Sequence, residues 1–202
     1  MREQVLTWLR DRVPKSRFNH ILGVEKMASA LAYHYDLDPQ KAATAGLMHD
    51  LAKNFSPARL LQEAQGANLE IDPIQAQTPH ILHADVSAII AEAEFGVSDR
   101  EILDAIRHHT LGQPGMSDLS CVVYIADALE PNRGQSEALE ALRESCWQNL
   151  YQAVWQTSDY AIQHLLAKQW VIHPRTILTR NWALQQAKSQ GKKAASRPPK
   201  TN

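Results

Sequence analysis

Apolar residues recur at intervals of three and four along most of the chain, and the alternating pattern typical of strands is scarce. The sequence therefore predicts an all-α protein. Residues 67–79 show no clear period, and a connection of that length often lies over a functional cleft. The predicted helices cover about residues 2–12, 16–35, 39–50, 57–66, 83–95, 98–111, 117–130, 137–169 as one helix or two, and 174 through at least 182.

Sequence signals for helix starts accompany these segments. Asp38-Pro39 and Ser56-Pro57 each place a capping side chain before a proline at the first helical position. Ser16 can cap the second helix, and Ser98 with Glu101 has the spacing of a capping box. Successive helices joined by short connections are typical of a helical bundle.

The chain of 202 residues is long enough to bury a core without disulfides, and we expect one domain over residues 1–187. Cys121 and Cys146 lie inside apolar helical patterns without metal-type spacing, which indicates reduced core residues. No apolar run resembles a signal peptide or approaches the roughly 20 residues needed to cross a membrane. These features predict a cytoplasmic protein.

The net charge of −1 is unevenly distributed. Five basic and no acidic residues follow position 187, so the body holds 16 basic and 22 acidic residues. An acidic body argues against a nucleic-acid-binding domain. The basic tail over residues 188–202 contains Gly191, Pro198 and Pro199, which should prevent a helix, and we expect it to be disordered. Contact of this tail with RNA or another anionic partner is the alternative.

Six side chains that suit divalent metals are distributed over the predicted helices. Iron, manganese and zinc accept imidazole and carboxylate ligands, and facing helices of a bundle can bring such ligands together. The six are His20, His49, Asp50, His83, His109 and Asp127.

The adjacent pair His49-Asp50 restricts how these ligands are arranged. Neighbouring helical residues diverge by about 100°, so both reach one ion only if it lies beside their helix and other helices complete the site. His108 and His109 diverge in the same way, and the helical pattern does not decide which of them faces the site. A carboxylate at the centre can bridge two metals, so two groups are expected: His20, His49, Asp50 and Asp127 around one ion, and Asp50, His83 and His109 around a second.

A divalent ion with open coordination positions lowers the pKa of bound water, which supplies a hydroxide near neutral pH, and also polarises phosphoryl oxygens. Arg17, Lys53 and Arg133 lie beside the expected ligands in the sequence, where their cations can bind phosphate oxygens. The sequence has no Walker loop, no Gly-x-Ser-x-Gly elbow and no His-Glu-x-x-His motif. Metal-assisted hydrolysis of a phosphoester or phosphoanhydride is therefore the predicted chemistry.

Seven segments occur in a fixed order, and together they identify a protein family more specifically than any one segment does. They are residues 17–20, 49–53, 82–84, 104–112, 124–127, 130–133 and 178–182. Together they resemble the HD-domain phosphohydrolases, and more closely the YqeK-type family of symmetrical bis(5'-nucleosyl)-tetraphosphatases of bacteria. The resemblance covers roughly residues 5–185 and implies a single HD-domain helical bundle with its metal site between helices.

The resemblance implies hydrolysis of diadenosine tetraphosphate to two ADP by a metal-activated hydroxide, with one or two iron ions as the cofactor and manganese as the alternative. It selects His109 over His108 as a ligand, and it implies that Asp50, Lys53 and Arg133 are catalytic. The nucleotide contacts it implies are Arg17, Lys53, His83, His109, Thr110, Asp127, Arg133, Arg175, Thr176, Leu178, Thr179 and Asn181.

Two other functions stay open at this point. Another HD-domain phosphohydrolase or phosphodiesterase, acting on a nucleoside monophosphate or a cyclic nucleotide, needs the same metals but a smaller pocket. The second alternative is a non-catalytic HD module that senses a nucleotide, although intact ligands count against it. The expected partners are a dinucleoside polyphosphate and its product ADP, no membrane is expected, and a homodimer is compatible with the sequence.

Overall fold

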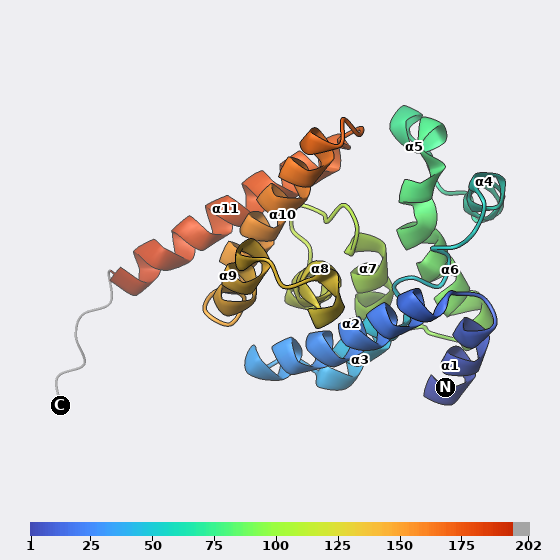
Figure 1. Ribbon diagram of the computed structural model, residues 1–202, viewed down its shortest axis with the longest axis horizontal. Coiled ribbons are helices and arrows are strands. Elements are labelled where there is room, and N and C mark those ends of the chain that lie inside the picture. The colour runs from blue at the N-terminus through green and yellow to red at the C-terminus, as the bar shows by residue number, and fades with distance from the viewer. Residues whose placement is uncertain (196–202) are drawn as a thin grey trace.

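The computed structural model describes residues 1–195, which form helices and no strand (Figure 1). The prediction of an all-α protein is confirmed. The α-helices are α1 (Arg2–Arg10), α2 (Lys15–His34), α3 (Pro39–Met48), α4 (Pro57–Gly66), α5 (Pro73–Gln77), α6 (His83–Phe95), α7 (Arg100–His108), α8 (Asp118–Leu129), α9 (Glu137–Ser145), α10 (Leu150–Ala167) and α11 (Pro174–Ala195), with 3-10 turns η1 (Pro79–Leu82) and η2 (Pro131–Arg133).

The two expected starts at a proline are confirmed. Asp38 Oδ1 accepts the N–H of Gln40 at 2.8 Å, and Ser56 Oγ accepts that of Arg59 at 3.3 Å. Each side chain satisfies a backbone donor that has no partner within the first turn of its helix.

Two other expected helix caps were placed one or two residues from the observed helix start. α2 begins directly after Pro14 without a side-chain cap, because the fixed φ of proline already suits a helix start, so Ser16 lies inside the first turn. α7 is capped by Asp99 instead of Ser98, and Asp99 also pairs with Lys41 of α3 at 2.9 Å. That tertiary contact is absent from the local pattern on which the prediction rested.

The stretch without a clear period contains a helix that the sequence analysis missed. Asp72 caps α5 and forms a capping box with Gln75. The signal was present in Asp72-Pro73, which is the same arrangement as Asp38-Pro39. Because α5 is only five residues long, its apolar positions do not establish a helical period.

The last helix is longer than expected. α11 continues to Ala195, past Gly191 and past the expected start of the tail at residue 188. A glycine costs a helix about 1 kcal/mol relative to alanine, which is not enough to end it. Residues 196–202, where the tail was also expected to be disordered, lie outside the described residues, and the domain boundary stays a prediction.

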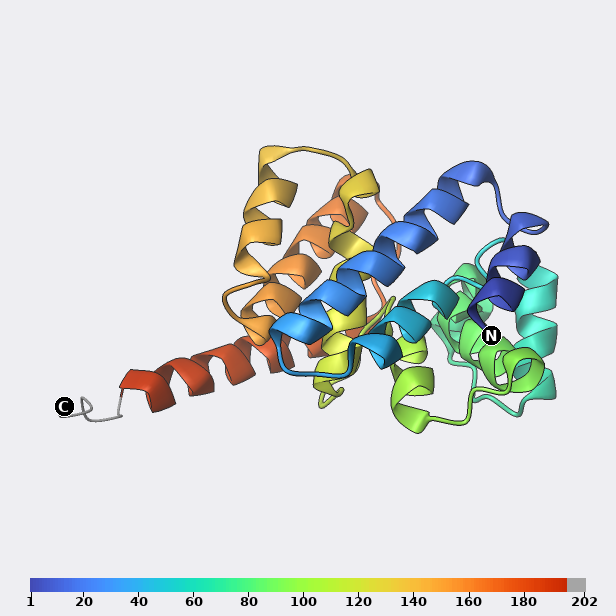
Figure 2. The same cartoon turned by 90° about the horizontal axis from the view of Figure 1, so that it is seen from below.

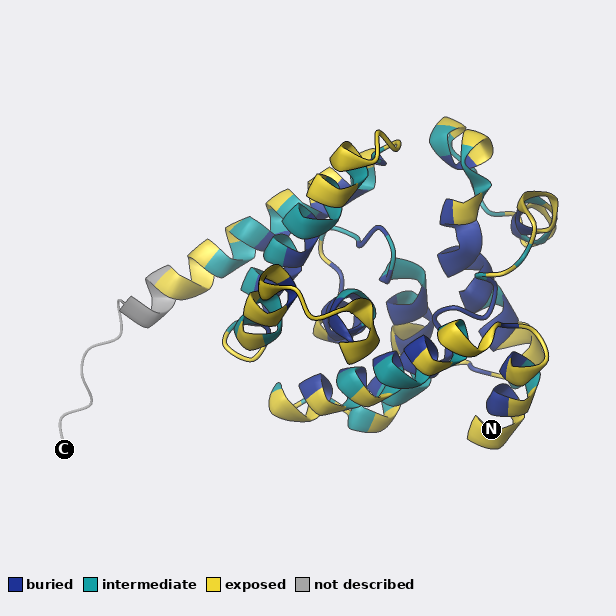
Figure 3. Ribbon diagram, in the orientation of Figure 1, coloured by how far each residue is buried: buried dark blue, intermediate teal, exposed yellow. Residues whose placement is uncertain are grey.

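The helices pack around α8. α2 and α3 lie side by side on one side of it, and α10 and α11 lie side by side on the other (Figures 1 and 2). Every residue from Leu119 to Ala126 in α8 is buried, which is typical of a helix at the centre of a bundle. Figure 3 shows the buried residues concentrated on α6, α7 and α8, with exposed residues on the outer faces and along the far part of α11.

Two further sequence expectations bear on this core. Cys121 and Cys146 are free and buried, as expected of reduced core residues. Within residues 1–195, every helix is too short or too polar to cross a membrane.

Candidate metal centre and nucleotide cavity

The six candidate ligands converge inside the bundle, although they come from five separate elements. Four histidines and Asp50 are buried, and the side chain of Asp127 is 19 % exposed. His20 comes from α2, His49 and Asp50 from the turn after α3, His83 from the first position of α6, His109 from the turn after α7, and Asp127 from α8.

His20, His49 and Asp50 form the first group of ligand atoms. The Nε2 atoms of the two histidines are 3.3 Å apart, and Asp50 Oδ2 lies 3.3 Å from His49 Nε2 and 3.8 Å from His20 Nε2. Two atoms that each lie about 2.1 Å from one ion are about 3.0–3.4 Å apart at octahedral or tetrahedral angles. The group therefore fits a divalent ion after small shifts.

Asp50, His83 and His109 form the second group. Asp50 Oδ1 lies 3.4 Å from His83 Nε2 and 3.7 Å from His109 Nε2, and these two nitrogens are 3.1 Å apart. Asp50 thus offers Oδ2 to the first group and Oδ1 to the second. This is the arrangement expected of a carboxylate that bridges two metals.

Asp127 lies beside the first group. Its Oδ1 is 3.1 Å from His20 Nε2 and 3.5 Å from His49 Nε2. The same oxygen accepts a hydrogen bond from Nη2 of Arg133. The structure thus brings all six candidates together, and their roles as ligands stay a prediction. We call the six side chains the ligand cluster.

The orientation of each imidazole favours metal binding. The Nδ1 atoms of His49, His83 and His109 lie 2.6–2.7 Å from the backbone carbonyls of Gly46, His80 and Ile106. A carbonyl only accepts, so each Nδ1 carries the proton and a neutral ring keeps its lone pair on Nε2. His20 has Glu130 Oε1 at 3.0 Å from its Nδ1 in the same role. Such contacts to the far nitrogen orient metal-binding histidines.

The electrostatics of the ligand cluster also favour a cation. Burial works against protonation of His49, but the carboxylates of Asp50 and Asp127 outweigh it and raise the pKa of His49 to about 9. Burial favours a neutral Asp50, yet His49, His83 and Lys53 hold the pKa of Asp50 well below its usual range. Burial, together with the neighbouring His49, lowers the pKa of His109. The carboxylates thus stay ionised in the interior and attract positive charge.

A cavity of about 490 Å³ opens beside the second group, within the size range of small-molecule sites. Lys53, Thr110 and Arg133 line its polar end, near the ligand cluster. Its far end is mainly apolar and aromatic. The residues there include Ile81, Leu111, Tyr160, Leu165, Trp170 and Val171. We call this space the larger cavity.

Four of the expected nucleotide-contacting residues lie close to the ligand cluster. Lys53 Nζ is 3.1 Å from His83 Nε2, and Thr110 Oγ1 is 2.9 Å from His109 Nε2. Arg17 Nη1 donates to Asp50 Oδ2 at 2.8 Å. Arg133 Nε donates to the backbone carbonyl of Asp127 at 2.7 Å, which holds its guanidinium at the edge of the cluster.

The carboxyl-terminal candidates meet the larger cavity at one residue, Thr176. Thr179 is buried, and its hydroxyl donates to the carbonyls of Leu111 and Arg175. Arg175, Leu178 and Asn181 are not part of the cavity wall. These residues were expected from the family resemblance, and a resemblance in sequence does not reveal which face of a helix borders a ligand site.

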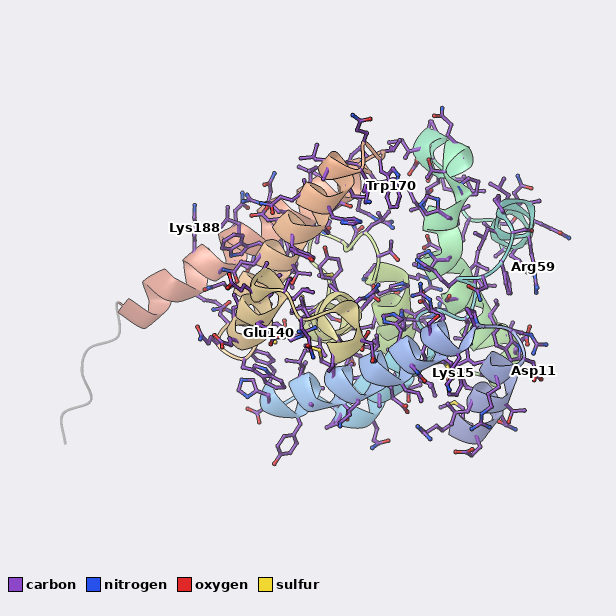
Figure 4. The ribbon with its side chains drawn as sticks, viewed as in Figure 1. Asp11, Lys15, Arg59, Glu140, Trp170 and Lys188 are labelled. Atoms are coloured by element: carbon purple, nitrogen blue, oxygen red, sulfur yellow. The ribbon has the colours of Figure 1, made fainter. Side chains whose placement is uncertain are left out.

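Most residues of the apolar part of the cavity were not among the sequence candidates, and they include Tyr160, Trp170 and His173. Trp170 is 60 % exposed at the rim, just beyond the end of α10, as the label in Figure 4 shows. The available signals were the aromatic residues of α10 and the irregular stretch before Pro174. An exposed tryptophan next to a cavity is a candidate surface for a nucleobase.

Comparisons with known proteins agree with this site. The HD domain family model matches residues 17–132, which include every candidate ligand. A symmetrical bis(5'-nucleosyl)-tetraphosphatase from Bacillus subtilis is 35 % identical over 181 residues, covering 90 % of this chain and 96 % of the relative. One of the same name from Halalkalibacterium halodurans is 33 % identical over 187 residues, covering 93 % and 99 %.

A crystal structure described as a predicted HD superfamily hydrolase involved in NAD metabolism, from Clostridium acetobutylicum, has the same fold. The TM-score is 0.87 at 30 % identity, over 91 % of this chain and 97 % of that one. The buried His and Asp residues thus form an HD-type site for a divalent metal. The chain belongs to the HD domain family and, within it, to the family of symmetrical bis(5'-nucleosyl)-tetraphosphatases.

Proposed function

We propose that this protein is a divalent-metal-dependent hydrolase that cleaves diadenosine tetraphosphate at its central phosphoanhydride and releases two ADP molecules. The observation that carries the proposal is the meeting of two ligand groups on Asp50, beside a cavity large enough for a nucleotide. Relatives of nearly the same length are named for this activity, which supports it.

The proposed ligands are the six residues of the ligand cluster, with Asp50 shared between two ions. Iron is the proposed metal and manganese the alternative, because imidazole and carboxylate ligands suit both. A divalent ion bound there would lower the pKa of a water molecule and polarise a phosphoryl oxygen. The protein holds the ligand nitrogens in place through the carbonyl contacts to Nδ1.

Lys53 and Arg133 are proposed to act on the phosphates. Hydrolysis adds water to one of the two central phosphorus atoms, and the electron pair of the broken P–O bond passes to the departing ADP. Cations next to that oxygen and to the attacked phosphate stabilise the transition state. Arg17, whose guanidinium lies at Asp50, is proposed to bind the phosphate chain rather than the reacting bond.

The larger cavity is proposed to hold one adenosine. Its apolar walls suit a purine base, and Tyr160 and Trp170 offer aromatic surfaces. Thr110 and Thr176 also line the cavity. Thr179 is proposed to act indirectly, because it bonds to the carbonyl of Leu111, whose side chain lines the cavity.

Product analysis with purified protein and added iron or manganese tests the proposal. ADP as the sole product of diadenosine tetraphosphate is the expected result. AMP together with ATP would mean asymmetric cleavage and would contradict it. Saturable binding without turnover would instead favour a nucleotide sensor, and turnover confined to nucleoside monophosphates or cyclic nucleotides would favour another HD enzyme.

We also infer a cytoplasmic location, because both cysteines are free and buried rather than paired. Fractionation of cells that produce the protein tests this inference. A homodimer is compatible with the proposed function, and size-exclusion chromatography of the purified protein decides the oligomeric state.

A further inference from the structure

A second cavity, of about 320 Å³, opens beside His20 of the first ligand group. It lies between the first turn of α2 and the turn η2. Ser16, Arg17, Asn19 and His20 line it from α2, Asn132 and Arg133 line it from η2, and Glu130 completes its wall. We call it the smaller cavity.

The two cavities border different members of the ligand cluster. His20, from the first ligand group, borders the smaller cavity, whereas His83 and His109, from the second group, border the larger one. Arg133 borders both. Asp50, shared by the two groups, therefore links the histidine that borders the smaller cavity to the two that border the larger one.

The smaller cavity has the chemistry of a nucleotide site with more polar walls than the larger one. Arg17 and Arg133 bring positive charge, and the uncapped first turn of α2 leaves backbone N–H groups that favour an anion. The side chains of Ser16 and Asn19 are exposed and form no hydrogen bond with another described residue. A hydroxyl and an amide can serve the hydroxyls of a ribose or the edge of a base.

We propose that the smaller cavity is the subsite for the second nucleotide. The larger cavity then binds one nucleoside diphosphate half of the substrate, and the smaller cavity binds the half on the other side of the cleaved central bond. This inference rests on the proposed function. A substrate with a nucleoside at each end of four phosphates has two equal halves, and cleavage at its centre requires both halves to extend from the cluster. Two subsites that border different members of the cluster fix the central bond at the metals, which accounts for symmetrical cleavage.

Counting bound ADP is the primary test, because it does not depend on turnover. Calorimetry with the manganese-loaded protein should give two ADP per chain in the wild type. Ser16→Trp fills the smaller cavity and should reduce the number to one. Ser29→Trp is the matched control, since Ser29 lies about 20 Å further along α2 and should leave two. If the wild type binds only one ADP per chain, or if Ser16→Trp still binds two, the proposal is overturned.

A gentler variant covers the case in which Ser16→Trp does not fold. Asn19→Asp keeps the size of the side chain at an exposed position and adds a negative charge to the cavity wall. It should weaken the second ADP by about tenfold or more while the first is nearly unchanged. If Asn19→Asp bound the second ADP as tightly as the wild type does, the proposed subsite would be wrong.

Kinetics separates the subsite from the proposed function. Ser16→Trp should lower kcat/KM for diadenosine tetraphosphate by at least about tenfold more than kcat/KM for adenosine 5'-tetraphosphate, which has no second nucleoside. An equal loss for both substrates means that only the shared phosphate site was damaged, and it overturns the subsite. If the wild type hydrolyses neither compound, the proposed function fails, and the ADP count still decides the subsite.

Discussion

Asp50 is the residue on which both ligand groups depend, since Oδ2 faces one group and Oδ1 the other. Replacing it with alanine removes a ligand from both ions at once. We expect Asp50→Ala to abolish turnover of diadenosine tetraphosphate while the helical fold stays largely intact, because the hydrophobic core does not include this side chain. Product analysis, elemental analysis of bound metal and circular dichroism together measure these effects.

Asp11→Ala is the matched control for that variant. Asp11, labelled in Figure 4, is exposed at the end of α1 and lines neither cavity. It should retain the activity and metal content of the wild type. Activity near the wild-type level in a fully metallated Asp50→Ala protein would refute the bridging role.

Arg133 lies where both cavities and the ligand cluster meet, and two hydrogen bonds to Asp127 fix its guanidinium. A cation held in position before the reaction stabilises developing phosphoryl charge at little reorganisation cost. Arg133→Ala should therefore reduce kcat/KM by about tenfold or more, which is about 1.4 kcal/mol or more of transition-state stabilisation. Steady-state kinetics with diadenosine tetraphosphate measures the loss.

Deletion of residues 189–202 is the control for the basic charge. The end of α11 projects away from the body of the molecule (Figure 1), so the shortened protein should keep nearly the wild-type kcat/KM. An innocuous Arg133→Ala combined with a damaging deletion would mean that the phosphates bind at the carboxyl-terminal end instead.

For single residues, the sequence indicates which side chains could bind a metal, but not which other side chains surround them. His20 and Asp127 could be selected because imidazoles and carboxylates recur in an ordered set of helical segments. The bond between His20 and Glu130 joins positions 110 residues apart, and no local pattern contains it. Trp170 was missed for the same reason, because a tryptophan at a helix end has many uses and only folding brings this one to a cavity.

Helices could be predicted where their own residues determine the ends. Asp38 and Ser56 cap helices that begin at the next residue, and Gly96 ends α6 with a φ of +68°. The start of α7 was misplaced because Asp99 is also held by Lys41 of another helix. A contact between elements thus accompanies the error at α7, whereas α5 was missed despite the local signal Asp72-Pro73.

Gly23 shows how the packing of two elements supports the ligand cluster. A Cβ at this position in α2 would overlap the carboxylate of Glu130, which accepts from His20 Nδ1. Gly23→Ala should displace Glu130 and lower metal affinity by about 10–100-fold, the usual effect of losing a contact that orients a metal ligand. Titration of the metal-free protein with manganese measures this affinity.

Gly66→Ala is the control for Gly23→Ala, because Gly66 also lies in a helix but no other residue packs against it. A Cβ there meets no atom within 4 Å, so the change should raise the free energy of unfolding by up to about 1 kcal/mol and leave metal affinity unchanged. If Gly23→Ala bound manganese as tightly as Gly66→Ala, the proposed support of His20 by Glu130 would be wrong.

The larger cavity is a property of the whole molecule, because its walls come from elements far apart in the sequence. Ile81 and Leu111 lie before α8, whereas Tyr160 and Trp170 lie well after it. The helical pattern predicted a bundle but gave no information on which helix faces would leave a space between them. The stretch over residues 67–79 was expected to lie over a cleft, but none of its residues lines this cavity, whose wall includes His80 directly after it.

One polar contact links His173, which lines that cavity, to α5. His173, before α11, lies with its Nε2 atom 2.6 Å from Oδ2 of Asp72, at the start of α5. His173 Nδ1 accepts the N–H of Arg175 at 3.1 Å, so the proton of the neutral ring is on Nε2 and is donated to Asp72. The other oxygen of Asp72 caps α5.

Because the two oxygens of Asp72 have different partners, one contact can be removed while the other is kept. Asp72→Asn can keep the capping oxygen, but its amide nitrogen would then face Nε2–H of His173, and two donors do not form a hydrogen bond. Without the link, the cavity walls should be held less firmly, so KM for diadenosine tetraphosphate should rise severalfold, about 1 kcal/mol, with little change in kcat. Asp38→Asn makes the same change in a capping residue of α3 that does not line either cavity, and it should leave both constants unaltered. Equal KM values for the two variants would show that the link does not shape the nucleotide site.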